Sequence, residues 1–289
     1  MRDFVITTDS NSDLPKDYLT EKGIGIIPHY YDIDQVTYGG GHELTVKKFS
    51  DKMRAGSVAT TTASNPAVIQ ETFSDYAARG FDILHISFSS ALSGGYNNIC
   101  MGAAEIREAY PQAQILVHDT LNVSLGQGLA IMKAVQMKEA GHTIGEIYTW
   151  LEEHRNEFCV QFTVEDLRYL YRGGRISKTT AIVGSMINVK PILYVNPEGK
   201  LVSLSSVRGR RRSLSTIVNN MAERIGTHIN DTLPICILHG DVPQDAQYVA
   251  GLIKEKLGTD NILINTVGPS IGAHSGPGAI GICFPGEYR

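Results

Sequence analysis

Four hydroxyl-rich or acidic loops hold most of the side chains that could do chemistry. They are Asp9–Asp13, Thr60–Ser64, Ser87–Ser93 and Asp119–Ser124, and each stands at a predicted strand end or helix start. Ser, Thr and Asp at such places often do no more than cap a helix. In an open α/β sheet, however, ligands bind beyond the carboxyl ends of the strands, where loops converge. Four such loops at one sheet edge therefore predict a shared polar site.

The run Ser93-Gly94-Gly95 is the sharpest feature of these loops. One hydroxyl and two flexible glycine amides at a predicted helix start form an anion receptor, because the first N–H groups of a helix lack partners. The chain has neither a general G-x-G-x-x-G nor a G-x-x-x-x-G-K-[ST] phosphate loop. Nucleotide binding therefore has little direct support.

A second focus is the glycine-rich run Gly268–Ala279, which surrounds one histidine, His274. A lone histidine is usually an ordinary loop residue. Glycines on both sides indicate instead that the backbone closely approaches a ligand toward which the imidazole points. No second His, Cys or carboxylate stands nearby at ligand spacing, so we expect no metal, and nothing in the sequence calls for a cofactor.

Apolar runs that alternate with amphipathic stretches place these loops in an α/β fold. We expect an N-terminal α/β domain with a parallel sheet over residues 1–155, including a small β insertion at about 28–45 around Gly39-Gly40-Gly41. After residue 155 we expect a C-terminal α/β domain with a mixed sheet over 156–289, and a ligand tunnel between the two. The predicted elements are strands at 4–8, 81–88, 115–118, 191–195, 201–207 and 233–239, and helices at 96–110, 125–140, 141–150, 213–230 and 244–257.

Composition excludes several classes of protein. Of the 289 residues, 42% are apolar and 19% charged, as in a globular chain, and no stretch approaches 18 uninterrupted apolar residues. We expect no membrane insertion and no secretory leader. The four cysteines form no C-x-x-C pair, which favours a reducing cytoplasm. The net charge of −4 is too mild to indicate nucleic acid, but residues 165–212 carry +7 while the remainder carries −11. That basic segment is either a docking surface for something negative or a solvated face.

Six motifs in order give the chain a resemblance to a known family. They are Thr8–Pro15 (TDSNSDLP), Ser89–Tyr96 (SSALSGGY), Asp119–Gly128 (DTLNVSLGQG), Leu170–Ser177 (LYRGGRIS), Lys190–Leu193 (KPIL) and Gly268–Gly278. With these motifs the chain resembles the DegV family of bacterial fatty-acid-binding proteins, nearly from end to end. Members of that family act as the lipid-carrying subunit of fatty acid kinase.

The resemblance implies a set of site residues. The fatty-acid carboxylate would be held by a Thr of a Thr-Ser-Gln-Pro loop, by the Ser of Leu-Ser-Gly and by the His of the last motif. The last two correspond to Ser93, followed by Gly94, and to His274. The first loop departs from the pattern, and alignment of Ile69 and Phe73 places its Thr and Ser at Thr61 and Thr62, with a register open by one residue. The resemblance also implies an apolar tunnel for a long acyl chain such as palmitate, and residues 181–187 are a candidate wall.

Two functions remain as alternatives at this point. The first is a non-catalytic carrier that presents the carboxylate of a long-chain fatty acid to an ATP-dependent fatty acid kinase, which would form the acyl-phosphate. Arg172, Arg175 and Arg210, Arg211 and Arg212 could then dock the partner or the new phosphate. The second is a serine hydrolase or acyltransferase that uses Ser93, Asp241 and His274, which follow the Ser, acid, His order of α/β-hydrolases. A sugar or nucleotide enzyme is disfavoured, because the chain lacks a phosphate loop and a catalytic carboxylate pair.

Overall fold

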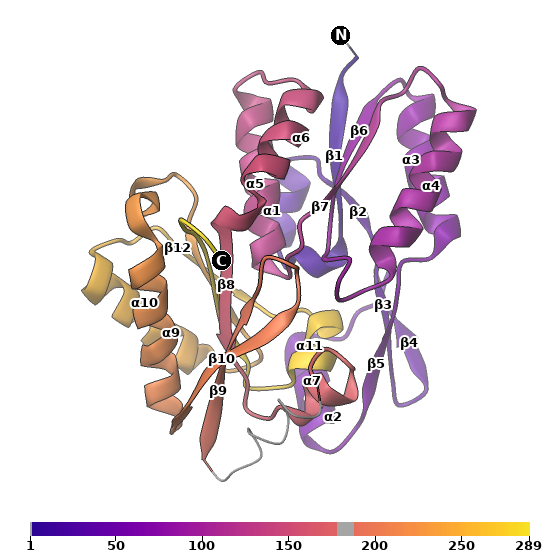
Figure 1. Cartoon of the computed structure of the whole chain (residues 1–289). Helices are drawn as coiled ribbons and strands as arrows, with labels where there is room; N and C mark the ends of the chain where they lie inside the picture. The colour runs from indigo at the N-terminus through magenta and orange to yellow at the C-terminus, as the bar shows by residue number, and fades with distance from the viewer. Residues whose placement is uncertain (1, 178–187) are drawn as a thin grey trace.

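The N-terminal half builds a parallel sheet in the computed structural model, which describes residues 2–177 and 188–289 (Figure 1). Its order is β2-β1-β6-β7, from β1 (Phe4–Asp9), β2 (Gly25–Ile27), β6 (Asp82–Ser87) and β7 (Ile115–Asp119). Helices α3 (Pro66–Ala78) and α4 (Gly95–Ala109) cover one face. Helices α1 (Lys16–Glu21), α5 (Leu125–Glu139) and α6 (Ile144–Glu153) cover the other. Side chains alternate accordingly, since Ile83 of β6 packs toward α3 and α4 while Leu84 and Ile86 pack toward α5 and α6.

A three-stranded antiparallel sheet interrupts this pattern after β2. It contains β3 (Tyr30–Ile33), β4 (Val36–Tyr38) and β5 (Ala59–Thr62) in the order β4-β3-β5, with α2 (Val46–Arg54) between the last two strands. The expected insertion at 28–45 therefore contains only two of the three strands. The third strand, β5, carries the threonines of the second loop into this sheet, where Thr61 pairs with Tyr31.

The C-terminal half forms a mixed six-stranded sheet in the order β10-β9-β8-β13-β11-β12. Its strands are β8 (Phe158–Thr163), β9 (Val189–Val195), β10 (Leu201–Arg208), β11 (Ile235–His239), β12 (Ile262–Thr266) and β13 (Ile280–Pro285). Helices α9 (Arg210–Arg224) and α10 (Pro243–Leu257) pack on one face, and the short helices α7 (Arg168–Arg172) and α11 (Pro269–Ser275) lie near one end (Figure 1). Only β11 and β12 run parallel among the adjacent pairs, so the prediction of an α/β fold with one parallel and one mixed sheet is confirmed.

Helix α5 joins the two sheets into one core. Its residues Leu125, Leu129 and Ala130 are fully buried, and they share a hydrophobic cluster with Leu84 of the parallel sheet and Val160 of the mixed sheet. Ten of its fifteen residues are buried, as expected for a helix between two layers, which explains why α5 shows almost no amphipathic pattern. The proposed boundary between residues 155 and 156 falls in a short 3-10 helix, Arg155–Glu157, that connects α6 with β8.

Two sequence expectations differ from the structure at this level, and a third concerns residues that the structure does not describe. The helix expected over 213–230 begins at Arg210 and ends at Arg224, followed by the 3-10 helix Gly226–Asn230. The run around His274 contains a helix, α11, that the glycines concealed. The candidate tunnel wall 181–187 lies outside the described residues. In residues 2–177 and 188–289, no helix combines the length and the apolar character needed to cross a membrane.

Candidate functional site

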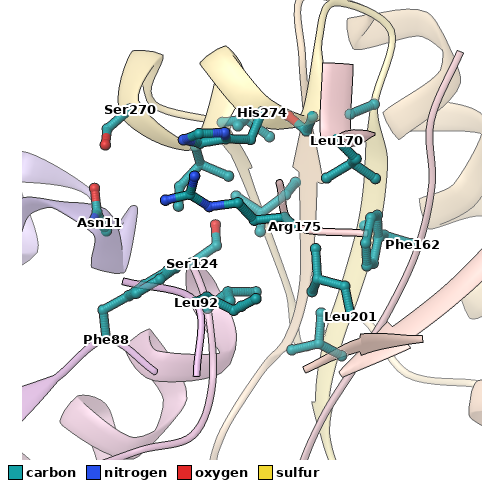
Figure 2. Close-up of a pocket in the computed structure, with 18 of the residues that line it drawn as sticks. Asn11, Phe88, Leu92, Ser124, Phe162, Leu170, Arg175, Leu201, Ser270 and His274 are labelled. Carbon is teal, nitrogen blue, oxygen red and sulfur yellow. The ribbon is translucent and has the colours of Figure 1, made fainter. Parts of the chain in front are cut away.

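A cavity lies where the loops of the parallel sheet meet the mixed sheet (Figure 2). The space between its side chains amounts to about 810 Å³, part of which is open solvent. All four loops singled out in the sequence contribute lining residues. These residues are Asn11, Thr61, Phe88, Leu92, Ser93, Val123 and Ser124. Three of these loops follow strands of the parallel sheet, which gathers its strand ends at one edge, whereas Thr61 comes from β5 of the three-stranded antiparallel sheet.

The opposite wall of the cavity is apolar and comes from the C-terminal half. Figure 2 shows Phe162, Leu170 and Leu201 on one side, facing the polar Asn11, Ser124 and Ser270 on the other. The apolar lining residues of this half are Val160, Phe162, Leu170, Leu201, Leu238, Val267, Ile271, Ala279 and Ile280. A cavity with one polar and one apolar wall suits a ligand with a polar head and a long hydrocarbon tail.

His274 stands at the polar side, in the last turn of α11. Its Nε2 lies 2.8 Å from Thr61 Oγ1 of β5. Burial, with a smaller contribution from the positive charge of Arg175, lowers the pKa of His274 to about 4, so the imidazole is neutral near pH 7. Its Nδ1 is buried without a hydrogen-bond partner and lies against the backbone of Gly173, where a side-chain Cβ would overlap the ring. When Nε2–H donates to Thr61, the threonine hydroxyl hydrogen is free to donate to a ligand.

Ser93 precedes α4 and already serves the helix. Its Oγ accepts a hydrogen bond from Gly95 N at 3.1 Å, and Gly94 is the N-cap residue. The hydroxyl hydrogen is not used in that bond and can donate into the cavity. The capping role and the ligand role are therefore compatible in one side chain. The helix N-terminus adds a favourable potential for an anion.

Thr61 and Thr62 lie on opposite faces of β5, because side chains alternate along a strand. Thr61 lines the cavity together with His274. Thr62 is exposed and lines a separate polar groove with Tyr30, Asp32 and Asn98. The geometry thus brings Thr61, Ser93 and His274 to one cavity and leaves Thr62 outside it.

Arg175 points into the cavity. In the sequence, its charge groups it with the other arginines that could dock a partner or a phosphate. Figure 2 shows its side chain extending inward so that the guanidinium lies close to His274. The guanidinium donates to Gly173 O, and burial lowers its pKa from the ordinary value. A half-buried cation that lines a cavity can attract an anionic group.

The remaining arginines divide into two kinds. Arg172, Arg211 and Arg212 are exposed, and Arg211 stacks on Tyr248 with its guanidinium 4.0 Å from the ring centroid. Arg210 instead donates through Nε to Asp245 at 2.8 Å and through a terminal nitrogen to Gly278 O at 2.6 Å. Arg210 therefore ties α9 to α10 and to the loop before β13, and the exposed members are the ones free to meet a partner.

A second, more polar groove adjoins the cavity at Ser93 and Arg175. It is lined by Ser90–Gly94, by 174–177 and by 200–203, including Lys200. The groove therefore adjoins the cavity beside two cations, Arg175 and Lys200.

Sequence reasoning missed His29 and left Asn11 without a role. His29 follows β2 and is buried, and its ring and Ser93 Oγ both lie 3.3 Å from the position that a Cβ on Gly95 would take. Burial lowers the pKa of His29 despite the nearby Asp9. Asn11 Oδ1 is buried without a partner at the same cavity. Asn11 belongs to the Asp9–Asp13 loop, which the sequence predicts to be part of a polar site. No motif around His29 predicted that it would lie at the cavity.

The contacts do not assemble the hydrolase triad that the sequence left open. Asp241 forms an ion pair with Arg54 of α2. In residues 2–177 and 188–289, no hydrogen bond joins either Ser93 or Asp241 to His274, whose Nδ1 lacks the carboxylate partner that a catalytic histidine needs. Within the same residues, no group of three or more His, Cys, Asp or Glu side chains is placed to hold a metal ion.

Comparisons with known proteins find relatives over nearly the whole chain. A family model described as "Uncharacterised protein, DegV family" matches residues 3–287. A DegV domain-containing protein of Clostridium perfringens is 41% identical over 291 residues, covering 100% of this chain and 99% of the relative. A DegV domain-containing protein of Caldanaerobacter subterraneus is 30% identical and covers 98% of this chain and 99% of the relative.

Solved structures share the fold along its whole length. A DegV family protein of Thermus thermophilus, described by its fatty acid binding, superimposes with a TM-score of 0.87 at 26% identity, covering 99% of this chain and 100% of that one. DegV of Bacillus subtilis, described as a fatty acid binding protein, gives 0.83 at 25% identity, covering 99% and 100%. The family model and the relatives together show that this chain belongs to the DegV family.

Proposed function

We propose that this protein binds one long-chain fatty acid, buries the acyl chain and presents the carboxylate at the polar side of the cavity. The observation that carries the proposal is a cavity in which the apolar Phe162, Leu170 and Leu201 face a side that holds the polar Asn11, Ser124 and Ser270. The fatty acids described for the Thermus thermophilus and Bacillus subtilis proteins support the same ligand class.

The head group would be held by Thr61, Ser93 and His274. Ser93 Oγ keeps its hydrogen for the carboxylate, and Thr61 Oγ1 does so when His274 Nε2–H donates to it across the 2.8 Å contact. Arg175 supplies the opposite charge from the mixed-sheet side. Hydrogen bonds to a charged group contribute about 1.5–3 kcal/mol each. Thr62 is no longer proposed for this role, because it faces the other groove.

The tail would supply most of the affinity. About fourteen methylenes at ~0.8 kcal/mol each correspond to roughly 11 kcal/mol of gross transfer free energy, less the entropy of ordering the chain. The apolar residues of β8, β10, β11 and β13 are the surfaces against which the tail would pack.

The carrier role extends to a partner. We propose that a separate ATP-dependent fatty acid kinase subunit approaches the groove beside Ser93 and Arg175 and converts the carboxylate to an acyl-phosphate. Arg172, Arg211 and Arg212, together with Lys200, would meet an acidic surface or the transferred phosphate. The chain itself would then be non-catalytic. Its four free cysteines are compatible with the reducing cytoplasm in which such a kinase would work.

Titration calorimetry with a saturated C16 fatty acid and with its methyl ester tests the binding step. The account predicts about one acid per chain and weaker binding of the ester, because the ester removes the charge but keeps the tail. Equal affinity for both ligands would show that the polar wall does not recognise the head group. The kinase step requires the cognate subunit and ATP, with acyl-phosphate trapped by hydroxylamine, and no product in that assay would contradict the partner role.

A further inference from the structure

Asp13 is a buried carboxyl group that the head-group account does not use. It follows the 3-10 helix Ser10–Ser12 with a left-handed backbone, φ 51°. Oδ1 accepts a hydrogen bond from Gly268 N at 3.0 Å, and Ser124 Oγ donates to Oδ2. The backbone carbonyl of Asp13 accepts a third bond, from Asn265 Nδ2 at 2.7 Å.

These three bonds join segments that carry the cavity. Gly268 caps the start of α11, the seven-residue helix that bears His274, Ser270 and Ile271. Ser124 caps the start of α5 and lines the same cavity. A helix this short has little stability of its own, so its position depends on such tertiary anchors.

The carboxyl group has unusual surroundings for an acid. Its ionisable neighbours are Asp9 at the end of β1 and the Cys283 thiol on β13. Burial, and to a smaller extent Asp9, raises the pKa of Asp13 to about 7, although the bonds from Ser124 and Gly268 act in the opposite direction. The ionisable groups in the adjoining cavity are His29, Arg175 and His274.

We propose that Asp13 is a positioning residue for the head-group site, which holds α11 and His274 against the N-terminal half and makes fatty-acid affinity depend on its own protonation. The proposal rests on the function proposed above. A bound carboxylate and an ionised Asp13 would place two negative charges beside the same loops. The bound carboxylate therefore disfavours the ionised form of Asp13. Because such coupling is reciprocal, affinity should fall as Asp13 loses its proton.

The central variant is Asp13→Asn. Asn tolerates the left-handed backbone, its Oδ1 can still accept from Gly268, and its amide can donate to Ser124. It imitates the protonated acid at every pH. The matched control is Asn265→Ala, which loosens the same anchor without changing the carboxyl group.

A third variant approaches the contact from its other side. Gly268→Ala would place a Cβ 2.6 Å from Asp13 Oδ1 at an ordinary backbone φ of −65°, so it displaces the carboxyl group with no change at residue 13. Thermal unfolding of each variant at each pH shows that the protein measured is folded.

The experiment measures the affinity for a fluorescent C16 fatty acid at pH 6 and at pH 8. We expect the wild type to bind about fivefold more weakly at the higher pH, the Asn variant to remain near the pH 6 value throughout, and the Asn265 variant to bind more weakly at both pH values with the wild-type slope. The Gly268 variant should bind more weakly at pH 6. Protonation of His29 or His274 would give a slope that survives in Asp13→Asn, and that outcome overturns the proposal. If the wild type binds no fatty acid at either pH, the proposed function fails instead.

Discussion

The substitution Gly173→Ala is a direct test of how His274 is held. Gly173 has an ordinary φ of −73°, so alanine introduces no backbone strain, and its only new demand is space for one methyl group. A Cβ there would overlap Nδ1 of His274 and would lie 3.0 Å from Cε1 and 3.3 Å from Cγ. Since optimal carbon contacts are about 3.5–4.0 Å, the imidazole must move by roughly 1 Å or more.

The displacement has a calculable cost for binding. Moving the ring by roughly 1 Å stretches the 2.8 Å contact between His274 Nε2 and Thr61 Oγ1 beyond hydrogen-bonding distance. One misplaced donor to a charged head group corresponds to about 1.5–3 kcal/mol, or roughly 10–150-fold in affinity for a fatty acid. The tail contacts remain, so some lipid should still copurify.

The assay is titration of delipidated protein with a fluorescent fatty acid and with the matching fatty alcohol. Gly251→Ala is the control, because a Cβ at this α10 position meets nothing within 4 Å. Wild-type affinity of a folded Gly173 variant would refute the role of His274. An equal loss for acid and alcohol would show that the methyl group blocks the tail rather than the head-group site.

Three further predictions follow from the same contacts. Ser93→Ala should weaken fatty-acid binding by ~1–3 kcal/mol, and calorimetry that gives the wild-type dissociation constant would place the head group elsewhere. Reversing the exposed Arg211 and Arg212 to Glu should lower acyl-phosphate formation with the cognate kinase, most at low salt, while bound lipid measured by extraction stays constant. Turnover unchanged across salt concentrations would make these arginines a solvated face. Because the folded-state pKa of His274 and of His85 is lowered to about 4, the unfolded chain takes up protons first on acidification, so the free energy of unfolding should fall as pH drops from about 6.5 toward 4. His274→Gln should make that slope shallower in urea titrations by the share of its own imidazole, because the pKa values of His29, His118 and His239 are lowered as well. An unchanged slope would mean that its imidazole is not buried as described.

The sheets were predictable from sequence because their strands carry strong periodic signals. The strand Asp82–Ser87, with its apolar Ile83, Leu84 and Ile86, is buried at every position in the structure, as expected for a central parallel strand. The loops that follow them were predictable for the same reason, since a parallel sheet gathers its strand ends at one edge.

Helix α11 was not predictable from its local sequence. Gly272 lowers the helix propensity of the interior, and seven residues are too few to form a helix alone. The helix exists because Gly272 allows close packing, with the Phe49 ring 3.0 Å from where a Cβ would lie, and because Asp13 anchors its start. Both partners are more than 200 positions away in the chain.

The direction of individual side chains was equally hidden. Three consecutive threonines at 60–62 differ only in strand register, and pairing of Thr61 with Tyr31 decides which one faces the cavity. Arg175 and Arg210 carry the same charge as Arg212, yet one enters the cavity and another bridges to Asp245. The charge of the segment cannot tell a buried arginine from an exposed one, because tertiary packing determines where each side chain lies.

Native mass spectrometry of the protein purified from a bacterial host tests the central claim most directly. The account predicts one long-chain fatty acid per chain in the wild type, released by organic extraction and rebound stoichiometrically by the delipidated protein. Its apolar wall of Phe162, Leu170, Leu201 and their neighbours would otherwise face water. A mass equal to that of the bare chain, together with no rebinding of added fatty acid, would contradict it.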